Sequence, residues 1–270
     1  MATKKKKSAS VHSKNTFAET LHTIGHRFSL SKVFDDFLTL SIAACTQNLH
    51  TQKSYYEDEY LETIAYYKNS ELRHEFPKAF AYLIAEMEER TGSGLGNDVL
   101  GDFFEQHISN GRNGQFFTPF PICQFMASIA HTDAAHDEAK PLRILDPACG
   151  SGRMLVAAHT VHKSHNEYYG IDIDRTCVKM AALNLFLNGM WDSEVMCANA
   201  LMPDDFVISY RISFLPLGIF KIEEKEKSLL WNMHRNSFTT QSKKTGDVSA
   251  TNQQPFSEAP KENGTQLILF

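Results

Sequence analysis

Short apolar runs and helical stretches alternate between residues 143 and 198, and this alternation constrains the fold more than any other feature of the sequence. Expected strands and helices lie in turn at 143–146, 153–163, 167–173, 176–188 and 194–198. This order predicts a parallel sheet, because parallel neighbouring strands need a crossover connection that a helix supplies. The chain is therefore expected to contain an α/β domain.

A glycine-rich turn follows the first expected strand. From Asp146 to Gly152 the sequence is Asp-Pro-Ala-Cys-Gly-Ser-Gly. Glycines permit positive φ and close approach of a ligand, and such a turn presents backbone amides at the strand ends. The second strand ends near Asp172, about 20 residues further on, where nucleotide-binding folds place an acid for the ribose hydroxyls. The alternatives are an ordinary tight turn and an N-cap role for Asp172, although Asp174 could also provide that cap.

A dinucleotide cofactor fits this turn poorly. The run differs from the spaced G-x-G-x-x-G fingerprint, and Asp146 stands where a pyrophosphate would be repelled. An acid at the end of the first strand instead suits a cationic ligand that carries an amino group. The pattern therefore favours a positively charged nucleoside over a nicotinamide cofactor.

Several motifs occur together in one order over roughly residues 96–202. They lie at 98–105, 115–119, 146–152, 170–172 and 184–189. In order and spacing they resemble the modification subunits, or N6-adenine methylases, of type I restriction systems, and an ordered set is more specific than one motif. The resemblance implies a Rossmann-like methyltransferase fold with a partial parallel sheet, S-adenosylmethionine (SAM) as cofactor, methylation of adenine in DNA, and a bacterial cytoplasmic location.

The resemblance also assigns roles within the expected cofactor site. One group forms the wall around the methionine part of SAM: Gln115, Phe116, Phe117, Thr118 and Pro119. A second group holds its amino acid end: Asp146, Pro147, Gly150, Ser151 and Gly152. Asp172 takes the ribose hydroxyls. Asn199 stands where the family usually has an Asp against the adenine amino group, and its amide oxygen can still accept that hydrogen bond.

The family's motif for the target base is not found in this sequence. That motif is Asn/Asp-Pro-Pro-Tyr/Phe, and the nine prolines include no Pro-Pro pair. Tyr210 and Phe214 lie near its expected place, and core packing is predicted for both. The catalytic residues are therefore unknown from the sequence. Two hypotheses follow: a specificity-type or other methyltransferase subunit completes the enzyme on DNA, or the chain is a non-catalytic SAM-binding module that acts through protein contacts.

The last five residues suggest a further partner. Gln266, Leu267, Leu269 and Phe270 match a pentapeptide that binds the bacterial sliding clamp, and Ile268 departs at the variable place. The preceding polar stretch could serve as a tether. The alternative is an edge strand that docks back on the sheet.

Composition sets the remaining expectations. A net charge of −5 limits any DNA-binding face to a local patch. Five cysteines without a CxxC pair argue against a disulfide framework or a metal site, and no apolar run reaches membrane-spanning length. The expected organisation is a disordered basic tail, a helical region, a Rossmann-like SAM-binding domain and a flexible tail, at 1–16, 17–110, 111–236 and 237–270.

Overall fold

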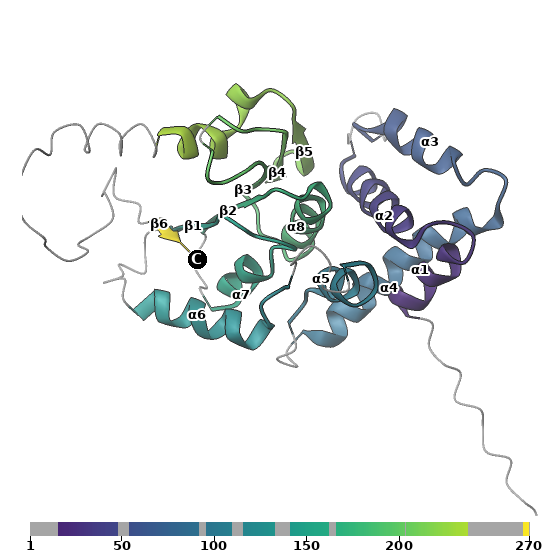
Figure 1. Ribbon diagram of the computed structural model, residues 1–270, viewed down its shortest axis with the longest axis horizontal. Helices are drawn as coiled ribbons and strands as arrows, with labels where there is room; N and C mark the ends of the chain where they lie inside the picture. Colours follow the sequence, from purple (N-terminus) through teal and green to yellow (C-terminus); the bar gives the residue numbers. More distant parts are fainter. Residues whose placement is uncertain are drawn as a thin grey trace, which may run out of the picture.

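A mixed β-sheet, with parallel and antiparallel strands, forms the centre of this α/β protein, and a group of helices packs beside it (Figure 1). The computed structural model describes residues 16–47, 54–91, 96–109, 116–132, 141–161, 166–202, 204–236 and 267–269. In this part of the chain, no helix combines the length and apolar character that crossing a membrane requires.

The helices that precede the sheet confirm the helical pattern expected from the sequence. Four of them are α1 (Phe17–Gly25), α2 (Leu30–Cys45), α3 (Glu57–Ala65) and α4 (Glu75–Arg90). A capping box begins α1, in which Thr16 and Glu19 satisfy each other's backbone amides. Thr16, which the sequence analysis placed in the basic tail, is therefore part of the folded structure.

A fifth helix connects this group to the sheet. It is α5 (Val99–Phe104), which continues as a single π-helical turn, Glu105–Ser109. Five of the six residues of α5 are buried, and Leu100 and Phe103 belong to the main hydrophobic core. Asp98 caps its first turn by accepting a hydrogen bond from the Gly101 amide.

The expected alternation of strands and helices is confirmed. After α6 (Phe120–Thr132) come β1 (Arg143–Asp146), α7 (Arg153–Val161), β2 (Glu167–Asp172), α8 (Arg175–Leu187) and β3 (Ser193–Cys197). β1, β2 and β3 are parallel neighbours. Ile144 lies opposite Tyr168, and Gly170 lies opposite Val195, so the three strands end at the same edge of the sheet.

An antiparallel hairpin extends the sheet beyond β3 and was not predicted. It consists of β4 (Ile208–Phe214) and β5 (Leu217–Ile222). Tyr210 is buried, as expected, but the prediction of core packing for Phe214 is wrong, because this residue is 55% exposed at the end of its strand. After β5, Lys225–Lys227 forms a 3-10 turn.

The carboxyl-terminal pentapeptide contains a sixth strand. β6 (Leu267–Leu269) pairs in parallel with β1, and the sheet order is β5-β4-β3-β2-β1-β6. This is the alternative of an edge strand docked on the sheet, in place of the expected free clamp-binding peptide, because the backbone of this run is already paired with β1. Gln266 and Phe270 lie outside the described residues.

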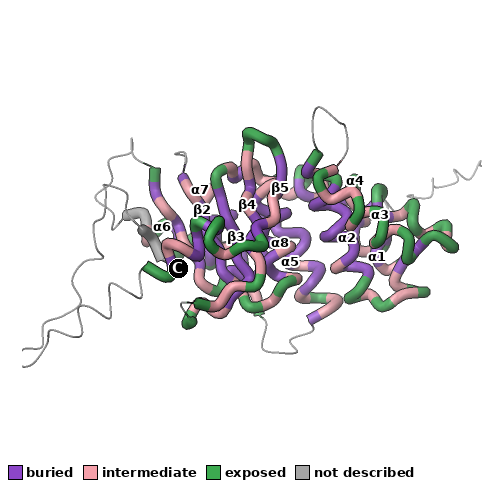
Figure 2. The backbone as a smooth tube through the Cα atoms, turned by 90° about the horizontal axis from the view of Figure 1, so that it is seen from above, coloured by how far each residue is buried: buried purple, intermediate pink, exposed green. Residues whose placement is uncertain are grey.

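The two faces of the sheet bury separate sets of side chains. Alternation along β2 directs Tyr168 toward the main core with α7 and α8, whereas Tyr169 and Ile171 face a smaller core on the other side. A helix over 229–236 closes the smaller core through Leu230 and Trp231. The burial pattern in Figure 2 follows this arrangement, with buried backbone through the central strands and α8.

Candidate functional site

Residues from separate parts of the sequence meet at the carboxyl ends of β1 and β2, and we call this edge of the sheet, with Asp146, the glycine-rich turn and Asp172, the crevice. Asp146 ends β1 and pairs with Gly170, while Asp172 ends β2 and pairs with Cys197. The turn between β1 and α7 crosses this edge, and its Cys149 amide donates to the Ile171 carbonyl at 2.9 Å. This backbone hydrogen bond holds the turn against β2. The carboxyl ends of parallel strands are where α/β sheets bind ligands.

Asp172 links the second strand to the glycine-rich turn. Its Oδ2 accepts a hydrogen bond from the Gly150 amide at 2.8 Å, and its Oδ1 accepts one from the Asp174 amide at 2.8 Å. The N-cap of α8 is Asp174, which accepts from the Thr176 amide at 2.7 Å. The cap alternative for Asp172 is therefore excluded, and its carboxylate instead faces the turn.

The turn needs glycine for two separate reasons. Gly150 and Gly152 have φ values of +52° and +80°, a region that other residues rarely adopt. A Cβ at Gly150 would lie 2.7 Å from the Phe117 ring, and a Cβ at Gly152 would lie 2.9 Å from Leu185 on α8. The turn is consequently packed on both sides, by the expected wall and by α8.

One residue of the expected wall segment lies against the glycine turn. Phe117 covers Gly150, stacks on Phe104 with ring centroids 6.0 Å apart, and has the Arg153 guanidinium 5.5 Å from its ring. Phe116 is 75% exposed, and Thr118 and Pro119 are exposed just before α6. Gln115 lies outside the described residues.

The crevice is electronegative. Asp146 is only 8% exposed, and burial together with the nearby charge of Asp172 raises its pKa from 3.8 to about 6, although the Ala148 amide donates to it at 3.0 Å. Burial also raises the pKa of Asp172. Within the described ranges, no Lys or Arg side chain forms an ion pair with either carboxylate. A cationic ligand would compensate both charges, so the two carboxylates fit a sulfonium nucleoside with an amino group.

Ser151 and Pro147 differ in how they face the crevice. The Ser151 side chain is fully buried and donates to Asp98 Oδ2 at 2.5 Å, away from the strand ends. Pro147 is half-buried directly after β1. The Ser151 hydroxyl is therefore engaged inside the fold and does not face the crevice.

Asn199 uses its amide oxygen locally. Its Oδ1 accepts from the Leu201 amide at 3.0 Å, and its own backbone amide donates to Asp205 Oδ2 at 2.5 Å. A carbonyl oxygen has two lone pairs, so one acceptor position remains for a ligand. The acid at this edge is supplied by Asp205, six residues later in the chain.

Two groups of residues around the crevice were missed by the sequence analysis. Apolar side chains stand exposed at the ends of β2 and β3, at Ile173, Leu201 and Met202. Ile173 directly follows Asp172, whereas Leu201 and Met202 lie four and five residues after Cys197, the last residue of β3. Exposed apolar side chains just beyond strand ends were the available signal. The second group is a buried network around Asp98, in a motif that the sequence analysis recognised without assigning it a role.

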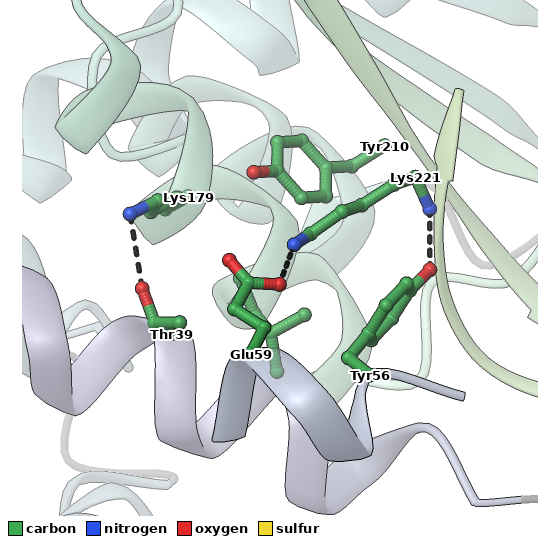
Figure 3. A pocket seen from close by; sticks show the side chains of 7 residues that line it. Thr39, Tyr56, Glu59, Lys179, Tyr210 and Lys221 are labelled. Atoms are coloured by element: carbon green, nitrogen blue, oxygen red, sulfur yellow. Dashed lines mark hydrogen bonds and ion pairs between the residues drawn. The ribbon is translucent and has the colours of Figure 1, made fainter. Parts of the chain in front are cut away.

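Side chains of the helical region and of the sheet pack against each other around a small gap (Figure 3). Tyr56 and Glu59 face Lys221 there, and Lys179 donates to the Thr39 hydroxyl at 3.0 Å. The side chains fill it so closely that no space remains for a water molecule. Among the described residues, no group of three or more His, Cys, Asp or Glu could hold a metal ion.

Comparison with known proteins bears on this same segment. A family profile described as N-6 DNA Methylase matches residues 95–258, which is more than half of the chain. The matched range begins just before α5 and includes the whole crevice.

Three curated relatives carry restriction-modification names. The chain is 28% identical over 159 residues to the type II restriction enzyme and methyltransferase RM.BcgI of Heyndrickxia coagulans, covering 52% of this chain and 24% of that one. It is 30% identical over 149 residues to the type II methyltransferase M.MamI of Microbacterium ammoniaphilum, covering 47% and 41%. It is 29% identical over 118 residues to the type I restriction enzyme MjaVIII methylase subunit of Methanocaldococcus jannaschii, covering 40% and 19%. The chain thus matches less than half the length of each of these relatives.

Proposed function

Because the chain belongs to the N-6 DNA methylase family, we propose that it is the SAM-binding part of an adenine-specific DNA methyltransferase of a restriction-modification system. One observation carries this proposal: within the family-matched segment, Asp146, the glycine turn and Asp172 form a single electronegative crevice. Each of these three elements contributes a different kind of contact.

The amino acid end of SAM would lie against the glycine turn. Asp146 is the group suited to its ammonium, because it is a buried carboxylate without a cationic partner among the described residues. The amides of Ala148, Cys149 and Gly150 already donate within the protein, so the start of α7 would offer its backbone amides and the positive end of a helix dipole to the carboxylate of SAM. Phe117 would cover this end and exclude water.

The nucleoside end of SAM would lie across β2 and β3. Asp172 would accept hydrogen bonds from the ribose hydroxyls at the end of β2. Ile173 and Leu201 would contact the adenine ring, and Asn199 or Asp205 would accept from its amino group. Bound SAM supplies an electrophilic methyl group on a sulfonium, so the work of the protein is to position that methyl toward the target base.

DNA and a second polypeptide segment would complete the enzyme. A flipped adenine needs acceptors for its amino group and an aromatic surface for stacking, and the sequence has no Asn/Asp-Pro-Pro-aromatic motif to provide them. The net charge of −5 also leaves much of the phosphate contact to another part of the assembly. We propose that a specificity-type or other methyltransferase subunit contributes both.

Transfer of labelled methyl groups tests this function. The chain is incubated with methyl-labelled SAM and unmethylated DNA, alone and with candidate partner subunits, and labelled N6-methyladenine is measured. The expected result is no incorporation by the chain alone and incorporation with the right partner. The control carries Asp172→Ala in the same assembly.

Two results would contradict the proposal. Persistent absence of transfer with every partner, despite SAM binding, would favour the non-catalytic module. Unchanged incorporation with Asp172→Ala would move the cofactor site elsewhere.

A further inference from the structure

Asp98 is a buried carboxylate at which four hydrogen bonds converge. It is 3% exposed, and its Oδ1 accepts from the Gly101 amide at 2.8 Å and from Asn184 Nδ2 at 2.7 Å. Its Oδ2 accepts from Ser151 Oγ at 2.5 Å and from Arg153 Nε at 2.7 Å. Each oxygen therefore serves a different part of the fold.

These bonds tie three segments around the proposed cofactor crevice. Ser151 belongs to the glycine turn, Arg153 begins α7, and Asn184 lies on α8. Asn184 also donates to the Ser151 carbonyl at 2.8 Å, so the turn is held by both its side chain and its backbone. Such hydrogen bonds to a buried charge are stronger than neutral ones.

Ion pairs extend the network toward the helical region. Arg153 Nη2 also contacts Asp102 at 2.6 Å, and Asp102 in turn contacts Arg90, at the end of α4, at 2.5 Å. Arg153 is only 9% exposed through its side chain, so its charge depends on these carboxylates. The orientation of Arg153 is thereby fixed from two sides.

Gly101 allows α5 to come this close. A Cβ at position 101 would overlap Asp98 Oδ2 and lie 2.5 Å from Ser151 Oγ. The first turn of α5 is therefore pressed against the glycine turn, with no side chain between them. This contact joins a helix outside the sheet to the loop that borders the crevice.

We propose that Asp98 is a positioning residue for the cofactor, which holds the glycine turn in its binding conformation before any ligand arrives. This inference rests on the proposed function. Gly150 and Gly152 both have positive φ. Glycine also populates negative φ, so contacts from the rest of the fold must select this conformation. A turn that is ordered in advance spares the ligand the entropy of ordering it. Asp98 touches no reacting group and acts through Ser151 and Arg153.

Asp98→Asn separates the two functions of this side chain. An asparagine keeps one oxygen, which can still accept from Gly101 and Asn184. Its amide nitrogen donates, so it cannot accept from Ser151 or Arg153. The variant thus removes the acceptor of Ser151 and Arg153, and so loosens the turn and the start of α7, while the N-cap of α5 stays in place.

Glu194→Gln is the matched control. Glu194 is 1% exposed, and it accepts from the Ser209 hydroxyl at 2.8 Å and from Arg211 at 2.9 Å. It therefore also pairs a buried carboxylate with an arginine and a serine. Glu194 lies near the start of β3, whereas the crevice lies at the opposite ends of the strands. A loss of SAM affinity that is equal in both variants would therefore result from lower overall stability and not from the glycine turn.

The experiment measures SAM affinity by calorimetry and amide hydrogen exchange over residues 150–153, with urea unfolding as the measure of overall stability. Asp98→Asn is expected to bind SAM at least about tenfold more weakly and to exchange the turn amides faster relative to global unfolding. Glu194→Gln is expected to lose overall stability but to keep SAM affinity within about twofold. Ser151→Ala, which leaves Asp98 and Arg153 paired, is expected to shift both readouts less, in the same direction.

Two results would overturn the inference: equal loss of affinity in Asp98→Asn and Glu194→Gln, or unchanged exchange over 150–153 in Asp98→Asn and Ser151→Ala. If wild-type protein does not bind SAM, the proposed function fails. Exchange in the ligand-free protein still tests the positioning role in that case, so the two failures are distinguishable.

Discussion

Ionisation of Asp146 at neutral pH lowers the free energy of unfolding of the protein. Burial and the nearby Asp172 raise its pKa from 3.8 to about 6, so its ionisation at neutral pH costs folding free energy. A buried charge without a cationic partner among the described residues is uncommon unless a ligand uses it. This conflict makes Asp146 the most informative single position in the crevice.

Asp146→Asn is therefore expected to stabilise the ligand-free protein. Between pH 3.8 and about 6 the folded state binds more protons than the unfolded state, so the stability of the wild type falls as pH rises through that window. The asparagine does not ionise and can still accept from the Ala148 amide. Urea unfolding at pH 7.5 should show a gain of up to about 3 kcal/mol, which shrinks toward pH 4. Equal stability of the two proteins at pH 7.5 would contradict this.

SAM binding is expected to have the opposite dependence on pH. The ammonium of the ligand needs an ionised Asp146, whose pKa is about 6. Affinity should fall as pH decreases through that value, by about tenfold between pH 7.5 and 5. Calorimetric titration at both pH values measures this change. In Asp146→Asn, binding should be weak and nearly independent of pH, and a wild-type affinity that does not change with pH would separate Asp146 from the ligand.

At the scale of elements, the glycine turn depends on close packing as well as on backbone conformation. Gly152→Ala would combine a φ of +80° with a Cβ 2.9 Å from Leu185 and 3.3 Å from the Ala181 backbone. Gly189→Ala is a matched control, because Gly189 has a φ of +70° but no neighbour closer than 3.9 Å.

The two alanine variants should consequently differ. Gly189→Ala is expected to cost about 1–2 kcal/mol of unfolding free energy, from backbone strain alone, and to leave SAM affinity unchanged. Gly152→Ala should cost more and should weaken SAM binding, because α8 and the turn must move apart. Urea unfolding and calorimetry measure both effects. Similar values for the two variants would mean that packing against α8 does not shape the turn.

The elements predicted from the sequence are those that local patterns determine. The segment from β1 to β3 was placed correctly because each strand is a short apolar run and each helix has its own periodicity. The β4–β5 hairpin was missed, although buried Tyr210 and Ile212 alternate with the less buried Arg211. The alternation is short, because Ser209 is also buried and interrupts the period of two.

The features of the site that were not predicted from the sequence depend on contacts between residues far apart in the chain. The motif residues Asp146, Gly150 and Asp172 were found because their spacing is local to one β-α-β unit. Asp98 was not recognised as part of the site, since its partners Arg153 and Asn184 lie 55 and 86 positions away. β6 was left open for the same reason, because its partner β1 lies more than 100 positions earlier in the chain.

At the scale of the whole molecule, the pairing of β6 with β1 predicts that the carboxyl-terminal run stabilises the sheet. Deleting residues 266–270 is expected to lower the melting temperature, because it removes the strand that pairs with Arg143, Ile144 and Leu145 and leaves the edge of β1 open. Thermal unfolding followed by circular dichroism measures the change, and removal of residues 1–10 is the control truncation. An unchanged melting temperature would mean that this run adds nothing to the sheet.

The whole protein joins a helical region to the sheet across α8. Lys179 on α8 pairs with Asp35 on α2 at 2.9 Å, and Tyr56 accepts a hydrogen bond from the Lys221 amide on β5 at 2.6 Å. The network of Arg90, Asp102 and Arg153 forms a second connection, close to the crevice. The helical region is therefore attached both far from the proposed cofactor site and beside it.

Calorimetric titration of SAM into the purified chain tests the central claim most directly. The crevice at the ends of β1 and β2 predicts saturable binding at one site per chain, and it predicts that Asp172→Ala abolishes this binding while circular dichroism shows the fold retained. Absence of binding to the wild-type chain, or equal affinity in Asp172→Ala, would contradict it.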